Sequence, residues 1–78
     1  NFIYLAKINA DAIKIDGSII STINSDELSY LVAKNIMNFA NEANIDVIAE
    51  YVSTKEIYDT VKSLGIHKFQ GFYFSKPS

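Results

Sequence analysis

The chain has 78 residues, 49% of them apolar and 21% charged, which is the composition of a globular rather than a disordered protein. Its formal net charge is -2 at pH 7 and its seven basic residues are scattered lysines, so we expect no binding to DNA or RNA polymers. The absence of cysteine excludes disulfides and zinc–thiolate sites. No apolar run is long enough to span a membrane, so we expect no membrane contact from this segment.

Both ends of the chain look like the interior of a longer polypeptide. The first residues include no initiator methionine and no signal sequence, and the last ones do not resemble a natural terminus. We therefore expect residues 1–78 to be an incomplete part of a single larger domain. Such a fragment exposes apolar surface along its cut edges, so we also expect it to form homo-oligomers.

The first predicted elements are a helix end and a short strand. Apolar side chains dominate residues 2–8, which suggests the last turns of a helix. Residues 12–16, Ala-Ile-Lys-Ile-Asp, are rich in β-branched side chains and stop at Gly17, which predicts a strand. Its two isoleucines should face one side of the sheet, while Lys14 and Asp16 face the other.

A long helix is predicted next. Asn24, Ser25 and Asp26 are candidates for its N-cap, and Asn44 is a plausible C-cap. Apolar residues recur at helical spacing and form a single stripe, which we expect to pack in the core. The stripe consists of Leu28, Leu31, Val32, Ile36, Phe39, Ala40 and Ala43.

Two more strands and a shorter helix complete the chain. Residues 46–50, Asp-Val-Ile-Ala-Glu, have an apolar centre without alternation, as in a parallel strand that is buried on both faces. Ser53 or Thr54 should cap the following helix, and Gly65 should end it in a left-handed conformation. Residues 68–70 predict a brief third strand. In the helix that ends at Gly65, the side chains expected to face the core are Ile57, Tyr58, Val61 and Leu64.

The predicted order is therefore α-β-α-β-α-β, which indicates an α/β fold. Strands that are joined by helical crossovers run parallel, and such crossovers are nearly always right-handed. The chain is too short for a closed (β/α)8 barrel, which needs roughly 250 residues. We interpret it as a parallel βαβαβ fragment of such a barrel.

Polar residues lie at or near the carboxyl ends of all three predicted strands, where parallel α/β folds build their sites. Lys14 could hold a water or a phosphate oxygen, or could simply reach solvent. Asp16 could support a site or make a turn hydrogen bond. Glu50 could bind a metal or orient a nucleophilic water, or could pair with Lys14. Gln70 could present its amide to a ligand or satisfy loop backbone.

The remaining aromatic and histidine residues favour structural roles. His67 is the only histidine and falls in a turn, which is typical of a surface residue. Phe69 and the run at 72–74 fit core packing better than a base-stacking platform.

Three segments of the chain resemble one protein family. Residues 11–18, D-A-I-K-I-D-G-S, resemble the D-x-(L)-K-I-D-x-S segment of EAL domains. Residues 47–54, V-I-A-E-Y-V-S-T, are similar to their V-(I/V)-A-E-G-V-E-T segment. Leu64-Gly65-Ile66 and the run at 70–77, Q-G-F-Y-F-S-K-P, resemble L-G followed by Q-G-Y-x-F-S-x-P. The order and spacing of the three motifs make the resemblance specific.

The resemblance implies a TIM-like barrel that hydrolyses cyclic di-GMP to a linear dinucleotide with two Mg²⁺ or Mn²⁺ ions, in the cytoplasm. This chain would supply strands six to eight, the last third of that domain. By position, Lys14 would contact the catalytic water, and Glu50 would hold the second metal or its bridging water. Gln70 would lie beside the dinucleotide, Pro77 would border a guanine, and Asp16 would support the site.

Two positions depart from the family pattern. Tyr51 stands where the family usually has glycine, and Ser53 stands where it has a second glutamate. The Glu-Ala-Leu motif and most metal ligands are not among these 78 residues. We therefore expect the fragment itself to be inactive and to bind no metal. The parent would be a phosphodiesterase or, alternatively, a degenerate EAL domain that binds cyclic di-GMP or dimerises as a regulatory module.

Overall fold

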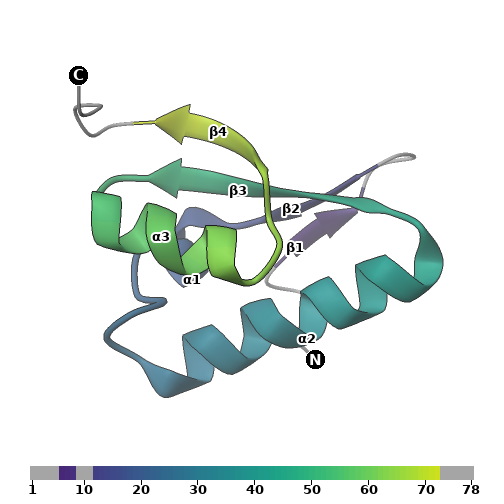
Figure 1. The fold of residues 1–78 in the computed structure, drawn as a ribbon, viewed down its shortest axis with the longest axis horizontal. Coiled ribbons are helices and arrows are strands. Elements are labelled where there is room, and N and C mark those ends of the chain that lie inside the picture. Colours follow the sequence, from purple (N-terminus) through teal and green to yellow (C-terminus); the bar gives the residue numbers. More distant parts are fainter. Residues whose placement is uncertain (1–5, 9–11, 73–78) are drawn as a thin grey trace.

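A computed structural model describes residues 6–8 and 12–72 of the chain (Figure 1). The elements are β1 (Ala6–Ile8), β2 (Ala12–Ile15), α1 (Gly17–Ile20), α2 (Glu27–Ala43), β3 (Asp46–Val52), α3 (Lys55–Ser63) and β4 (Lys68–Phe72). None of the helices within these residues is long and apolar enough to cross a membrane.

The four strands form one sheet in the order β1-β2-β3-β4. The β2, β3 and β4 strands run parallel to one another, and α2 and α3 provide the crossovers between them (Figure 1). The predicted α/β class and parallel βαβαβ arrangement are therefore confirmed.

The start of the chain differs from its prediction. Residues 6–8 form β1, which pairs antiparallel with β2, so the prediction of a helix was wrong there. Residues 2–5 of that prediction lie outside the described residues. The segment is apolar without a clear period, so its sequence fits a helix or a strand. Pairing with the open edge of β2 makes it a strand. The residues of the segment alone do not reveal β2 as the pairing partner.

The turn after β2 contains a short helix, α1, that was not predicted. Asp16 caps it, because its carboxylate accepts hydrogen bonds from the backbone N–H of Ser18 at 3.0 Å and from its hydroxyl at 2.6 Å. The α1 residues Ile19 and Ile20 are buried in the core. Four residues are too few to show a helical period, so this element has no clear sequence signal.

The α2 helix has the ends that were predicted and a different buried face. Asp26 accepts a hydrogen bond from the Leu28 N–H at 3.0 Å, and Asn44 ends the helix with a left-handed φ of 58°. However, Leu28 is 67% exposed, and Leu31 and Phe39 are each 43% exposed, so the expectation that they lie in the core was wrong. The buried residues are Ser29, Ala33, Ile36, Met37 and Ala40.

Small side chains explain why α2 is rotated about its axis and buries a different face from the predicted one. Ala33 and Ala40 are fully buried and let the helix approach the sheet closely. Ser29 is also buried, and its hydroxyl lies 2.7 Å from that of Thr22, so its polar group is satisfied. Leu28, Leu31 and Phe39 of the predicted stripe are turned toward the outside.

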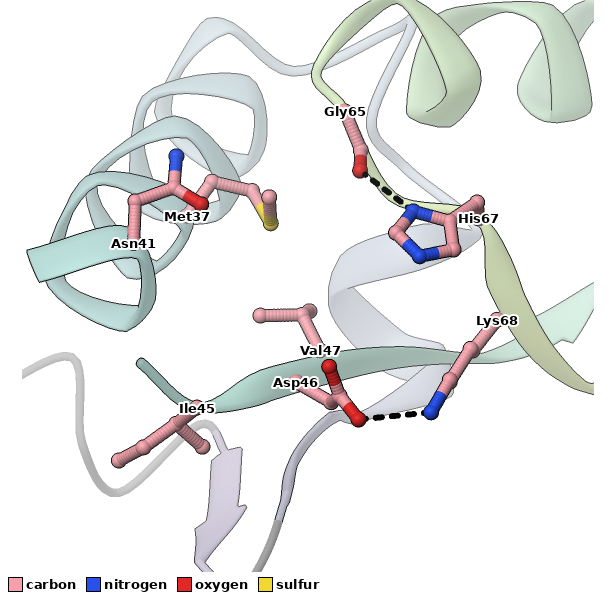
Figure 2. A pocket seen from close by; sticks show the side chains of 8 residues that line it. All are labelled: Met37, Asn41, Ile45, Asp46, Val47, Gly65, His67 and Lys68. Atoms are coloured by element: carbon pink, nitrogen blue, oxygen red, sulfur yellow. Dashed lines mark hydrogen bonds and ion pairs between the residues drawn. The ribbon is translucent and has the colours of Figure 1, made fainter. Parts of the chain in front are cut away.

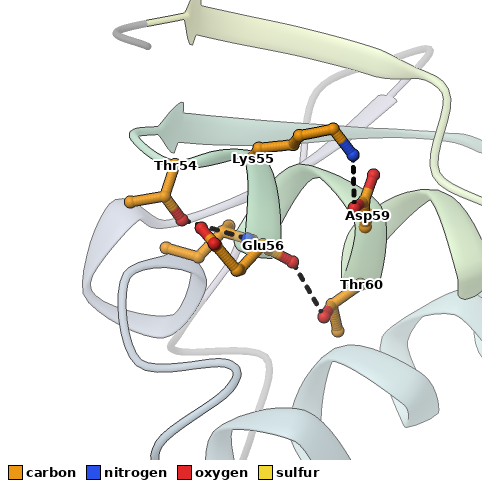
Figure 3. A network of polar contacts seen from close by, with 6 residues as sticks. Thr54, Lys55, Glu56, Asp59 and Thr60 are labelled. Carbon is orange, nitrogen blue, oxygen red and sulfur yellow. Dashed lines mark hydrogen bonds and ion pairs between the residues drawn. The ribbon is translucent and has the colours of Figure 1, made fainter.

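Thr54 is the N-cap of α3, and its hydroxyl accepts a hydrogen bond from the Ile57 N–H at 3.1 Å. Figure 3 shows that polar contacts continue along its outer surface, with Lys55 donating to Asp59 at 2.8 Å. The Thr60 hydroxyl donates to Asn24 at 2.5 Å and so ties α3 to the loop before α2.

The inner side of α3 and its end follow the prediction. Ile57 and Val61 are buried, and Tyr58 and Leu64 pack against the core. Gly65 has a φ of 97°, as expected for the residue that follows a helix.

One face of the sheet carries the core. The β2 residues Ile13 and Ile15 and the β3 residues Val47 and Ala49 are buried in one cluster with side chains of all three helices. The side chains between these buried residues on both strands are partly buried or exposed. The last residue of β3, Val52, is buried again. The expectation that the second predicted strand is buried on both faces therefore does not hold within the described residues. The less covered face of the sheet carries polar side chains.

Candidate functional site

Three of the polar residues singled out from the sequence share the less covered face of the sheet. Glu50 of β3 pairs in register with Gln70 of β4. Lys14 of β2 pairs with Ile48, two residues before Glu50 on the same strand. Because residues in register share a face and side chains alternate along a strand, all three lie on one face. Lys14 lies two residues further from the carboxyl ends of the strands than Glu50 and Gln70.

Glu50 and Gln70 open onto a shared surface pocket of about 250 Å³ near the carboxyl ends of β3 and β4. Its lining is completed by Tyr51 and Gly71. Lys14 does not line it. The structure thus brings Glu50 and Gln70 together, with Lys14 on the same face but deeper along the sheet.

Glu50 has no ion-pair partner among the described residues. The two ion pairs found there are Lys55–Asp59 at 2.8 Å and Lys68–Asp46 at 2.6 Å. Of the roles considered for Glu50, pairing with Lys14 is therefore not what the structure shows. A partly buried carboxylate without a cationic partner is suited to attract a cation from solution.

The donor set fits only part of a metal site. A carboxylate oxygen is the ligand that Mg²⁺ and Mn²⁺ prefer, and Glu50 could supply one. Within residues 6–8 and 12–72, no three acidic, histidine or cysteine side chains cluster closely enough to hold an ion. The other ligands of a metal at Glu50 would have to come from residues outside these ranges.

The remaining predicted site residues contribute differently. The Asp16 carboxylate is engaged with Ser18 at the start of α1, which is the turn hydrogen bond that was considered for it. Pro77 lies outside the described residues, as do Tyr73 and Phe74 of the aromatic run.

Tyr51 has an unusual backbone at the edge of the pocket. Its φ is 62°, a left-handed value that residues other than glycine rarely adopt. The sequence marked this position through its departure from the glycine of the EAL pattern, but it gave no indication that the glycine-like backbone is kept. Gly71, also in the pocket, has a φ of 81° and was missed as a lining residue.

A second, smaller pocket lies at the opposite ends of the strands (Figure 2). It measures about 70 Å³, and its polar lining includes Asn41, His67 and the Asp46–Lys68 ion pair. The Lys68 ammonium lowers the pKa of Asp46 below its ordinary value through a hydrogen bond and its charge, and His67 adds a smaller effect. The Nδ1 of His67 lies 3.2 Å from the Gly65 carbonyl oxygen and its side chain is exposed, in agreement with a surface role. This end of a parallel barrel sheet usually serves stability rather than chemistry.

Comparison with known proteins assigns the chain and its fold to a family. The family model of the EAL domain matches residues 1–77. The chain is 44% identical over 73 residues to the cyclic di-GMP phosphodiesterase PdeF of Escherichia coli, covering 94% of this chain and 10% of that protein. It is 40% identical over 74 residues to the cyclic di-GMP phosphodiesterase PdeA of Borreliella burgdorferi, covering 95% of this chain and 11% of that protein.

A solved structure shows the same arrangement. The EAL enzyme Bd1971 in its cAMP- and cyclic-di-GMP-bound form superposes with a TM-score of 0.76 and 34% sequence identity, over 87% of this chain and 18% of that one. The chain spans about a tenth of the length of the two relatives above. The resemblance first seen in three short motifs is thus confirmed, and the chain belongs to the EAL domain family.

Proposed function

We propose that the protein containing this chain hydrolyses cyclic di-GMP in a metal-dependent reaction, and that residues 1–78 are the last third of its EAL domain. The observation that carries the proposal is the position of Glu50. It lies in a pocket opposite Gln70, without an ion-pair partner among the described residues, within a segment that matches the EAL family over residues 1–77.

The reaction is attack of water on a phosphodiester, which breaks one P–O bond and leaves a linear dinucleotide. A bound Mg²⁺ or Mn²⁺ would lower the pKa of that water and neutralise phosphate charge. Glu50 would hold the cation through its carboxylate. Lys14, on the same face of the sheet, would favour the hydroxide form of the attacking water by its positive charge. The Gln70 amide would donate a hydrogen bond to the dinucleotide.

The test compares the full-length protein with the isolated chain, each incubated with cyclic di-GMP and Mg²⁺ or Mn²⁺. We expect linear product only from the full-length protein, because residues 1–78 supply too few metal ligands. Glu50→Gln in the full-length protein should lower kcat by a factor of about 100 or more, while Glu56→Gln on the exposed side of α3 should not. Hydrolysis by the isolated chain, or full activity of Glu50→Gln, would contradict the proposal.

A second function is favoured by two residues of this chain. Tyr51 and Ser53 replace the glycine and glutamate of the EAL pattern, and they are the first and third residues after Glu50. Under this alternative the domain binds cyclic di-GMP as a regulatory module and does not hydrolyse it. Binding by the full-length protein without linear product would support it.

A further inference from the structure

Tyr51 keeps a backbone conformation that is costly for any residue with a side chain. Its φ of 62° is left-handed, and a non-glycine residue persists in this region only when its surroundings impose it. Such outliers cluster at sites where a side chain has to be held in a particular place. The position of this outlier, beside Glu50 in the pocket, raises the question of what the side chain does there.

Gly17, the first residue of α1, lies close to the base of the Tyr51 side chain. A Cβ placed on Gly17 would lie 3.0 Å from the Tyr51 Cβ and 3.7 Å from its Cγ. The absence of a side chain at Gly17 thus makes room for the tyrosine. Above this contact the residue remains 51% exposed and forms part of the pocket lining with Glu50, Gln70 and Gly71.

We propose that Tyr51 is a ligand-contacting residue that stacks on a purine ring of the bound cyclic dinucleotide. This inference rests on the proposed function, because it takes the ligand of Glu50 and Gln70 to be a cyclic purine dinucleotide. A phosphate that is bound to the cation at Glu50 would place the attached nucleoside within reach of the next residue along the strand. Aromatic side chains stack on nucleobases, and a tyrosine loses little conformational entropy in doing so.

The alternative role for a bulky residue at this position is to obstruct the pocket. Half of the residue is exposed and the pocket of about 250 Å³ remains open beside it, so stacking is favoured. The two roles predict opposite effects when the ring is removed, and this makes them separable by experiment.

The experiment uses the full-length protein with Tyr51→Phe and Tyr51→Leu, which both keep a bulky side chain on the left-handed backbone. The dissociation constant for cyclic di-GMP is measured by calorimetry in the Lys14→Met background, which slows hydrolysis and keeps the Glu50 carboxylate, and KM and kcat are measured in the parent background. For Tyr51→Leu we expect Kd and KM to rise roughly tenfold with kcat nearly unchanged. Tyr51→Phe should stay within about twofold of the parent, because it keeps the ring. Phe39→Leu, which removes an exposed aromatic ring from α2, is the matched control and should change neither constant.

The outcomes separate this inference from the proposed function. Turnover by the parent with an unchanged Kd in Tyr51→Leu overturns the stacking role alone, and so does tighter binding, which would mean that the ring obstructs the pocket. Binding without turnover would contradict the proposal of hydrolysis. The Kd values of Tyr51→Phe and Tyr51→Leu, then measured without the second substitution, would still test the stacking role of Tyr51. Absence of both binding and turnover overturns the two proposals together.

Discussion

Tyr51 and Gly71 lie at the same level of neighbouring strands, and both have a left-handed backbone, with φ values of 62° and 81°. The pairs on either side of them, Glu50 with Gln70 and Val52 with Phe72, stay in register. Regular alternation would place Val52 on the face of Glu50, yet Val52 is fully buried in the core cluster. The left-handed residue therefore returns β3 to the core directly after the pocket.

The first prediction concerns the conformational cost at Tyr51. Tyr51→Gly and Tyr51→Ala both remove the ring, but only alanine keeps a Cβ in the left-handed region. Such a Cβ costs roughly 1–2 kcal/mol, partly offset by the entropy that glycine loses on folding. We expect Tyr51→Gly to be more stable than Tyr51→Ala by about 1 kcal/mol, measured as the free energy of unfolding in urea. Equal stabilities would mean that the backbone relaxes out of the left-handed region.

The second prediction concerns the start of α2. The Asp26 carboxylate caps this helix by accepting a hydrogen bond from the Leu28 N–H at 3.0 Å. Asp26→Ala should lower the free energy of unfolding by about 1 kcal/mol, and Asp26→Asn, which also caps well, should change it by only a few tenths. Urea denaturation of both variants measures the difference. An equal loss in both variants would show that the charge, and not the cap, stabilises the helix.

The third prediction tests which face of α2 is buried. Ile36 is 1% exposed and Leu28 is 67% exposed, although the sequence placed both on one apolar stripe. Ile36→Ala should lower the free energy of unfolding by about 2–5 kcal/mol. Leu28→Ala should change it by less than about 0.5 kcal/mol. Comparable losses at the two positions would contradict the observed rotation of the helix.

Features with local causes could be predicted from the sequence. The strand centred on Lys14 was predicted because a β-branched run stops at a turn glycine. The ends of α2 were predicted because Asp26 and Asn44 are suited to the backbone geometry at a helix start and end. The proximity of Glu50 to Gln70 could be inferred because carboxyl ends of parallel strands meet at one edge.

The features that could not be predicted depend on partners distant in the chain. The rotation of α2 follows from Ala33 and Ala40 against the sheet and from the hydroxyl contact between Ser29 and Thr22. A periodicity count weighs large apolar residues most and so favours the wrong face. The β1 strand depends on pairing with β2, which its own residues do not reveal.

The last prediction concerns the charge pair at the amino ends of β3 and β4. Lys68 lies 2.6 Å from Asp46 and, with a smaller effect of His67, holds the pKa of this carboxyl below its ordinary value. A lowered pKa in the folded state means that the pair stabilises the fold above the ordinary carboxyl pKa. That contribution is lost as the pH falls through the lowered pKa.

Lys68→Met should therefore raise the pKa of Asp46 toward its ordinary value, measured by NMR titration of the side-chain carboxyl carbon. It should also remove the contribution of this pair to the acid dependence of stability. Lys55→Met is the matched control, because it removes the exposed partner of Asp59 and leaves the Asp46 pair intact. An unchanged pKa of Asp46 in Lys68→Met would show that the exposed pair is fully screened by solvent, and that the strand ends are held together by their backbone pairing alone.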